Sequence, residues 1–434
     1  MKGKYFSLHH RFLAWLGKRT NTIILSPNPV SIGNASEDYL FGLIKARLEG
    51  RKLVILFPYS LPWPFRQPTF DPAIFYLESD LLALKFRSPL SCLLSFLFSV
   101  YFLLVVVFQH CLVKIFGIET NGYYFRPLAG QDLLWRPSEE QVVFDWELLH
   151  AQNWEEQISE PPQLSLPGKM LKFCEVERER IGLPQEAWFV CLHVRDGGYK
   201  GDFNNVRNAN IENYMEAITE ITRRGGWVIR MGDRSMQELP ICSQVIDYAH
   251  SSSLSSTMDV YLIKGCAFYV GTSSGHMDTA LLFGKPVVHT NMTHWINLMP
   301  MRKGDILIFK HVYSKSLRSF ISIQEWMQQA SLITSDFSST DWEFVENSSE
   351  ELAEVVAEYM DYRGKTESTQ LQNEFRKAHA RAVHELSKIH RFGSSDVENC
   401  NEWFRFGSRM LSWKGEVSAK YLEKNWLQCS RSSK

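Results

Sequence analysis

The stretch that decides the fold is FYVGTSSGHMDTALLFGKPVVHTN, residues 268–291. It opens with an apolar run typical of a buried strand and passes through a Gly- and Ser-rich turn into a helical pattern. Gly284 is placed to end that helix, and the apolar run Val287-Val288-His289 follows it. A strand, a helix and a further strand in this order predict a parallel β-α-β unit.

The same alternation extends towards the N-terminus of the chain. Further strands are predicted by the apolar runs at 188–194, 227–229, 245–248 and 266–270. Helical patterns separate them, one of them opened by Asn210 as a cap and closed by Gly225-Gly226. This half of the chain is therefore expected to form a doubly wound parallel sheet, which binds ligands outside the carboxyl ends of its strands.

The N-terminal part carries a looser version of this pattern. Strands are predicted at 22–25, 53–57 and 73–77, with a helix at 36–48. A chain of 434 residues exceeds one ordinary core, so two domains are expected. We expect an α/β domain over 1–168, a second over 169–345, and a charged, helical extension over 346–434.

Composition excludes several classes of protein. The formal net charge of -1 gives no general attraction for nucleic acid, so no nucleic-acid partner is expected. The 8 cysteines form no C-x-x-C pair, and several lie in apolar runs. They are expected to be buried, reduced thiols, which also disfavours a zinc site.

An apolar segment stands out in the N-terminal half. Residues 88–113 contain no Lys, Arg, Asp or Glu, and such a run is long enough to meet a bilayer. The alternative is a buried core helix. The first 19 residues are basic and aromatic without an acidic residue, which suits either an anionic membrane surface or a solvated terminus. We expect a membrane contact by a monotopic or re-entrant anchor rather than a simple span, because a span would separate the two domains.

The turn Gly271-Thr272-Ser273-Ser274-Gly275 allows two kinds of chemistry. It fits the G-x-S-x-G elbow of a serine hydrolase, with Ser273 as nucleophile. It fits equally a cradle in which the amides at a helix start hold a phosphate and the hydroxyls of Thr272, Ser273 and Ser274 add donors. A plain structural turn is the third possibility.

The hydrolase interpretation needs an acid and a histidine later in the chain. Asp305 with His311, or Asp341 with His384, are candidates, but an upstream oxyanion motif is missing. The cradle uses more of the sequence, because polar clusters also follow two other strands: His193-x-Arg195-Asp196, and Gly232-Asp233. A guanidinium at Arg195 can grip a phosphate with two parallel hydrogen bonds, although it suits a structural ion pair as well. No Walker A or G-x-G-x-x-G sequence occurs.

Longer motifs carry a resemblance. The segments from Cys191 to Asp233, Met258 to Gly275 and Ala280 to Asn291, together with INLMPMRKGDILIFK and GEVSAKYLEKN, resemble bacterial glycosyltransferases encoded with surface-polysaccharide and O-antigen genes. The resemblance covers about 190–434 well and the N-terminal half loosely. The H-x-R element is also similar to that of GDP-fucose-dependent fucosyltransferases. The apolar segment 88–113 is not a feature that we associate with the family.

The resemblance implies a GT-B-like fold of two Rossmann-like domains facing a cleft, with the acceptor on the 1–168 side and the nucleotide-sugar donor on 169–345. By it, Arg195 binds the donor phosphates and residues 271–275 form the loop under the nucleotide-sugar. Gly232 and Asp233 are further expected donor-binding residues. Asp196 and His193 are the nearest candidates for the general base of the acceptor hydroxyl, and the N-terminal half is an alternative source of it. No D-x-D sequence occurs, and Asp336 to Asp341 is poorly spaced for a divalent cation, so neither metal nor cofactor is expected.

The expected activity is transfer of a sugar to a surface glycan or lipid-linked acceptor at the cytoplasmic face of the bacterial inner membrane. Three alternatives stay open: a serine hydrolase using Ser273, a non-catalytic membrane-associated scaffold, and transfer of another activated group such as pyruvyl.

Overall fold

The computed structural model describes residues 16, 19–25, 27, 32–56, 73–116, 162–198, 201, 203–293, 302–328, 341–362, 367–389 and 415–427. Most of the basic segment 1–19, and Asp336, lie outside the described residues. The chain forms two compact units, one of Met1–Phe173 with Leu281–Gly284 and the other of Cys174–Ala280 with Lys285–Lys434. The cleft expected between two domains stays a prediction.

The larger unit is built on a parallel sheet of seven strands in the order β12-β8-β7-β6-β3-β4-β5. The strands are β3 Phe189–His193, β4 Trp227–Arg230, β5 Val245–Ile246, β6 Phe268–Gly271, β7 Val287–Met292, β8 Ile306–Phe309 and β12 Glu416–Val417. Every residue of β3, β6 and β7 is buried, as expected for parallel strands covered on both faces. The predicted α/β class with a parallel sheet is confirmed for this unit.

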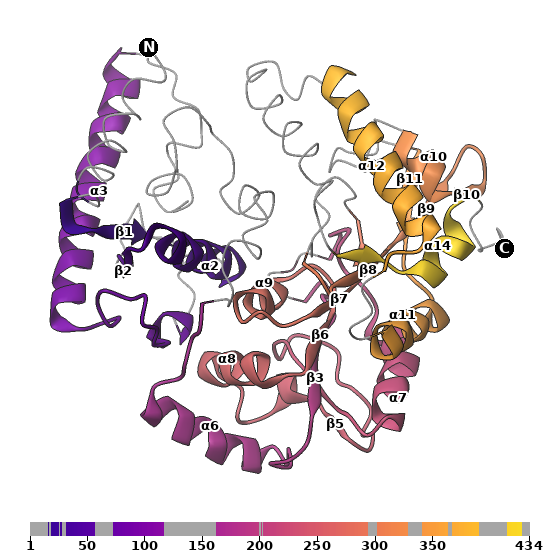
Figure 1. Cartoon of the computed structure of the whole chain (residues 1–434), viewed down its shortest axis with the longest axis horizontal. Helices are drawn as coiled ribbons and strands as arrows, with labels where there is room; N and C mark the ends of the chain where they lie inside the picture. Colours follow the sequence, from indigo (N-terminus) through magenta and orange to yellow (C-terminus); the bar gives the residue numbers. More distant parts are fainter. Residues whose placement is uncertain are drawn as a thin grey trace. The chain divides into compact units, whose positions relative to one another are not determined.

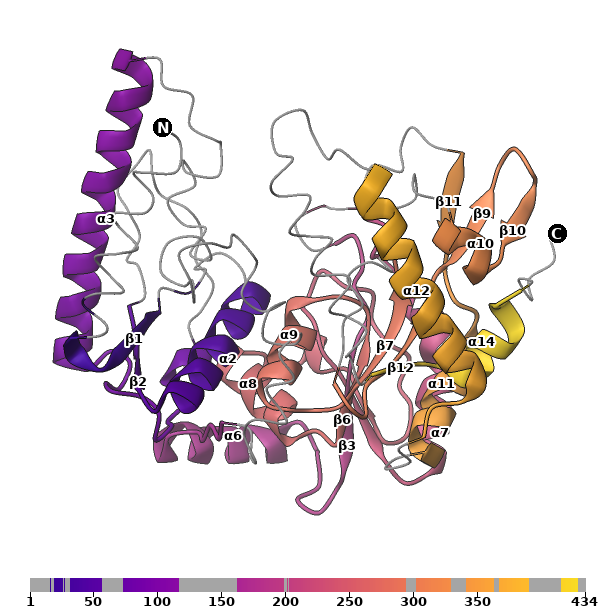
Figure 2. The same ribbon diagram turned by 45° about the horizontal axis from the view of Figure 1, so that its top comes forward.

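Helices cover both faces of this sheet. Figures 1 and 2 show α7 Met215–Arg223 and α11 Ser349–Tyr362 on one face, and α8 Ser256–Gly265 and α9 Gly275–Leu282 on the other. The cap predicted at Asn210 is present, because its side chain accepts a hydrogen bond from the Glu212 amide at 2.9 Å. It opens the 3₁₀ turn η5 Ile211–Tyr214, which runs directly into α7.

The sheet is completed from far along the chain. After β8 come a small antiparallel sheet and several helices, and only then β12, which pairs in parallel with β8 through Glu416↔Ile306 and Val417↔Leu307. The intervening elements are β9 His311–Ser314, β10 Ser319–Ile321, α10 Ile323–Gln328, β11 Trp342–Val345, α11 and α12 Gln370–Ile389, and α14 Ala419–Asn425 follows β12.

The smaller unit contains one β-α-β motif. Strands β1 Thr22–Leu25 and β2 Lys52–Ile55 pair in parallel across helix α2 Ile32–Glu49. The strand predicted at 73–77 is wrong: the structure has a 3₁₀ turn, η1 Ala73–Tyr76. A short apolar run has no periodicity that separates a buried strand from a buried turn, and here Phe75 packs its ring 5.4 Å from that of Tyr39. Helix α6, Gly168–Arg180, follows later in the chain.

The apolar segment forms one helix, α3, Pro89–Phe116, which includes the predicted 88–113 almost entirely. Its Phe98 side chain packs with Val54 and Leu56, at and after the end of β2. The structure describes no α3 side chains at 102, 105–114 and 116. Among the described residues, no helix has the length and apolar content that crossing a membrane requires.

Candidate functional site

The order of the strands defines where a ligand would bind to the larger unit. From β3 the chain continues to β4 and β5 on one side, then returns to β6 on the other side of β3 and continues to β7 and β8. The direction therefore reverses between β3 and β6, whose carboxyl ends lie side by side through the pair His193↔Gly271. In open α/β sheets this reversal point leaves a crevice in which ligands bind.

The two predicted clusters after β3 and β6 meet at this point. The Thr272 amide donates to the carbonyl oxygen of His193 at 3.1 Å, and the Arg195 amide donates to the Thr272 hydroxyl at 2.9 Å. Gly271 allows this closeness, because a Cβ there would lie 2.0 Å from the His193 oxygen. The turn at 271–275 is thus fastened to the segment that carries Arg195 and Asp196.

His193, the last residue of β3, is almost fully buried at 6% exposure. Its ring lies 4.8 Å from the ring of His276, in the first turn of α9, and its Nδ1 has no hydrogen-bond partner among the described residues. Burial, followed by the charges of His276, Arg230 and Arg195, lowers its pKa well below 6.5. The imidazole is therefore neutral at pH 7.

The turn at 271–275 leads into α9 with its own cap. The Ser274 hydroxyl accepts from the Met277 amide at 3.4 Å and shares a hydrogen bond of 3.1 Å with the hydroxyl of Tyr269. The first amides of a helix have no acceptor within the helix, and the helix dipole favours an anion beside them. The start of α9 at Gly275 and His276 is thus suited to a phosphate.

Ser273 has a partner that the sequence did not suggest. Its hydroxyl lies 2.9 Å from Nε2 of His289, a fully buried side chain on β7. Asp305 and His311 were the first candidate pair for a triad with Ser273. In the structure Asp305 accepts a hydrogen bond from the Val287 amide at 2.8 Å, and His311 pairs with Glu351 at 2.8 Å.

The second candidate pair, Asp341 with His384, does not form a triad with Ser273 among the described residues either. The Asp341 carboxylate accepts hydrogen bonds from the hydroxyls of Ser314 and Ser316, and the side chain of His384 lies outside the described residues. The sequence did contain a signal that could have pointed to His289, because strands predicted at 266–270 and 287–289 in one β-α-β unit are expected to be neighbours in the sheet. Finding it would have required the register that sets Gly271 opposite His289.

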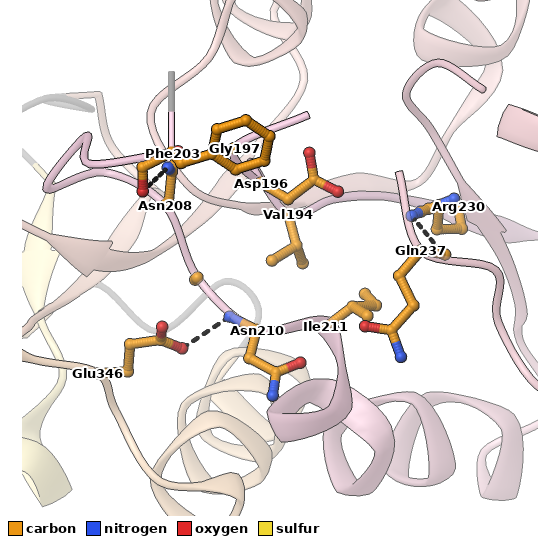
Figure 3. Close-up of a pocket in the computed structure, with 11 residues that line it drawn as sticks. Val194, Asp196, Gly197, Phe203, Asn208, Asn210, Ile211, Arg230, Gln237 and Glu346 are labelled. Atoms are coloured by element: carbon orange, nitrogen blue, oxygen red, sulfur yellow. Dashed lines mark hydrogen bonds between the residues drawn. The ribbon is translucent and has the colours of Figure 1, made fainter. Parts of the chain in front are cut away.

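A pocket of about 300 Å³ lies at the carboxyl ends of β3 and β4. Figure 3 shows Asp196 and Arg230 on one side and Glu346 on the other. Arg230 is held by Asp247 at 2.9 Å and by the Gln237 carbonyl at 2.7 Å. The Asp196 carboxylate accepts from the Gly198 amide at 2.9 Å, which orders the loop after β3. The pocket thus places a carboxylate of the predicted site next to the reversal point.

Gly232 and Asp233 form the turn after β4. Gly232 has φ +143°, and a Cβ there would lie 2.2 Å from the sulfur of Met236. The Asp233 carboxylate accepts from the Ser235 amide at 2.8 Å. These contacts give both residues a role within the turn itself, and their role towards a donor stays a prediction.

Asp278, in the first turn of α9, is a residue that sequence reasoning missed. Burial raises the pKa of its carboxyl to about 7, against the opposing charges of Arg207 and His276. The only signal in the sequence was an acidic residue early in the helix, which is common and unspecific. A carboxyl with a pKa near neutrality beside a polar site is able to exchange protons there.

Replacing Asp278 by asparagine should change how the stability of the protein depends on pH. Between about pH 4 and 7 the Asp278 carboxyl keeps its proton in the folded protein but has lost it in the unfolded chain. Its contribution to the free energy of unfolding is therefore full below about pH 4 and disappears as the pH rises through about 7. The excess stability of the wild type over Asp278→Asn should fall across that range by about 1–4 kcal/mol, discounted for partial exposure. Denaturant unfolding at several pH values measures it.

Comparison with known proteins gives distant structural likeness only. No family model matches the chain, and no curated protein matches its sequence. A glycosyl transferase family 9 structure from Veillonella parvula DSM 2008 aligns with TM-score 0.34 and 10% identity, over 62% of this chain and 80% of that one. The E. coli heptosyltransferase WaaC with ADP-2-deoxy-2-fluoro heptose aligns with TM-score 0.34 and 10% identity, over 66% and 92%. At these values the likeness contributes nothing to the functional argument, which rests on the residues of the site.

Proposed function

We propose that this chain is a glycosyltransferase that moves a sugar from a nucleotide-sugar to a surface glycan or lipid-linked acceptor, at the cytoplasmic face of a bacterial inner membrane. It uses neither a metal nor another cofactor. The proposal includes the GT-B-like plan and the similarity of His193-x-Arg195 to the fucosyltransferase element.

One observation carries the proposal: the segment with Arg195 and the start of α9 are fastened together at the reversal point of a doubly wound sheet. A guanidinium-bearing segment and a helix N-terminus are two independent means of binding phosphate, and here both belong to one edge of the sheet. The two negatively charged phosphates of a diphosphate can bind the guanidinium and the helix N-terminus at the same time. A nucleoside diphosphate is also the leaving group of a nucleotide-sugar.

The chemistry follows from that placement. When the bond from the sugar to the phosphate breaks, negative charge develops on the departing diphosphate. Fixed donors that face this charge lower the barrier without reorganising, and Arg195 with the amides of Gly275 and His276 would supply them. Such donors replace the divalent cation that other enzymes use for this charge.

The acceptor hydroxyl needs a general base. Asp196 is the better of the two predicted candidates, because it lines the pocket of about 300 Å³ while His193 is buried with a pKa held low. A pocket of this size lies at the lower end of ligand sites and suits one sugar ring or one nucleoside. Asp278 is the reserve candidate, because its pKa is near neutral.

A thermal-shift panel of UDP, GDP, CMP and dTDP sugars tests the function. One donor class should stabilise the chain, by about 2.7 kcal/mol at a hundred times its dissociation constant. Incubation of that donor with surface-glycan acceptors should then release the nucleoside diphosphate. Absence of any shift at millimolar donor would contradict the proposal, and binding without turnover would favour the scaffold alternative.

Ser273→Ala separates the cradle from the hydrolase elbow. In a cradle the amides remain, so transfer should fall by about tenfold or less, whereas loss of a nucleophile costs about 10⁴-fold or more. The contact between Ser273 and His289 at 2.9 Å is the observation that keeps the hydrolase in view. Steady-state rates of transfer measure the difference.

A fluorophosphonate probe gives the complementary readout. We expect no covalent label on Ser273, since its hydroxyl serves to fix the turn against β7. The variant Ser274→Ala, which weakens the cap but leaves the Ser273–His289 pair, is the matched control and should cost about 1 kcal/mol of stability. Stoichiometric labelling that disappears in Ser273→Ala would establish the hydrolase instead.

A further inference from the structure

Helix α3 of the smaller unit buries polar side chains and exposes apolar ones, the reverse of an ordinary surface helix. Its buried face is a row of serines spaced one turn apart, Ser91, Ser95 and Ser99, with exposures of 3%, 4% and 5%. The Ser99 hydroxyl donates to the Ser95 carbonyl oxygen at 2.8 Å, so it satisfies its hydrogen-bonding capacity within the helix. Three small hydroxyl side chains, together with Phe98, thus face the protein.

The opposite face carries the large apolar side chains. Their exposed fractions lie between 41% and 63%, and the residues are Leu90, Leu93, Phe96, Leu97, Val100 and Leu104. At about 100° per residue these positions span an arc of about 120°, turned away from the serine row. A water-soluble surface helix shows the reverse arrangement, with its apolar stripe towards the core.

The composition around this face indicates lipid as the occupant. Residues 88–113 contain no charged side chain, while Lys85 and Arg87 precede them and Lys114 follows. A paired coiled-coil helix would present a narrow stripe flanked by charged residues, whereas here the flanks include Leu94 and Tyr101. Apolar side chains bounded by basic ones match acyl chains under anionic headgroups.

The packing of the serine face determines how the helix would meet the bilayer. Phe98 is buried with Val54 and Leu56, so one side of α3 is occupied by its own unit. A helix that spans a bilayer alone is exposed to lipid on all sides, whereas the described side chains of α3, at 89–101, 103, 104 and 115, include one face that packs on its own unit. Contact from one side corresponds to a helix lying in the plane of the interface.

We propose that the face of α3 defined by Leu90, Leu93, Phe96, Leu97, Val100 and Leu104 inserts into one leaflet of an anionic bilayer, with the helix axis parallel to the membrane. The inference is independent of sugar transfer. It assigns the protein to the membrane surface through a single helix face, with Arg87 as a candidate headgroup contact at one end, while Lys85 pairs with Glu78 at 2.6 Å.

Vesicle co-sedimentation of the full chain tests the proposal. Vesicles of phosphatidylcholine and phosphatidylglycerol in equal parts should carry the wild type into the pellet. Leu93→Glu with Leu97→Glu should reduce the bound fraction at least tenfold. Both side chains are more than half exposed, so the melting temperature should hold. Leu317→Glu with Ile241→Glu, at exposed apolar positions of the larger unit, is the matched control and should bind as the wild type does.

The other outcomes count against the proposal. A wild type that remains in the supernatant, or a Leu93/Leu97 variant that still pellets, overturns it. A dimer in sedimentation velocity that this variant dissociates, without vesicle binding, would assign the face to a second copy of the chain. If the glutamates lower the melting temperature, Leu90→Gln with Leu104→Gln repeats the test at the first and last residues of the face. The thermal-shift panel of nucleotide-sugars, repeated on the same variants, tests the proposed sugar transfer independently of membrane binding.

Discussion

Replacing Gly271 by alanine should strongly destabilise the larger unit. The new Cβ would lie 2.0 Å from the carbonyl oxygen of His193, which is a backbone atom and cannot rotate away. Either β6 moves away from β3 or the turn after it changes path. We expect the free energy of unfolding to fall by about 3 kcal/mol or more, with donor binding lost. Denaturant unfolding and the donor thermal shift measure the two effects.

Gly225→Ala is the matched control for this substitution. Gly225 also has a positive φ, of +83°, but a Cβ there meets nothing within 4 Å. It should cost about 1 kcal/mol from backbone strain and leave donor binding unchanged. If Gly271→Ala were as mild as this control, the contact between the two strand ends could not be holding the site.

Arg195→Lys should weaken donor binding by about tenfold or more, and transfer with it. Lysine retains the positive charge but loses the planar pair of donors that grips a phosphate along two parallel hydrogen bonds. The Arg195 amide, which bonds to Thr272, is unaffected by the change, so the turn should keep its structure. Calorimetry with the nucleoside diphosphate of the preferred donor measures the affinity.

Arg234→Lys supplies the comparison. Arg234 is an exposed arginine just after the neighbouring strand β4, and we expect no change in affinity when it is replaced. An Arg195→Lys variant with wild-type affinity would return Arg195 to a structural ion pair and remove the main phosphate ligand from the proposal.

Local sequence patterns were sufficient for the succession of strands and helices from β3 to β7, whereas the strands β8 and β12 of the same sheet were not predicted. The strands from β3 to β7 each open on an apolar run, and capping residues such as Asn210 and Gly284 delimit the helices between them. Elements that depend on distant partners were not predictable in this way. The run at 73–77 became a 3₁₀ turn because its packing with Tyr39 decided its conformation, and no periodicity records that packing.

The site was predictable to the level of strand ends. His193, Arg195 and the turn from Gly271 are neighbours because parallel strands align their carboxyl ends, which the alternation of strands and helices already implies. Atomic relations required the register: the contact of Ser273 with His289 depends on which residue of β7 lies opposite Gly271. The elevated pKa of Asp278 depends on burial, which the sequence around it does not reveal.

The edge strand β12 has a consequence for biosynthesis. Its two residues, Glu416 and Val417, extend a sheet whose first strand, β3, begins at Phe189. Because β12 is the strand that pairs with this edge of β8, the edge has no partner strand among the described residues until 416–417 have been synthesised. An unpaired strand edge recruits other chains. We therefore expect chaperone protection of the β8 edge to matter most before β12 has been synthesised.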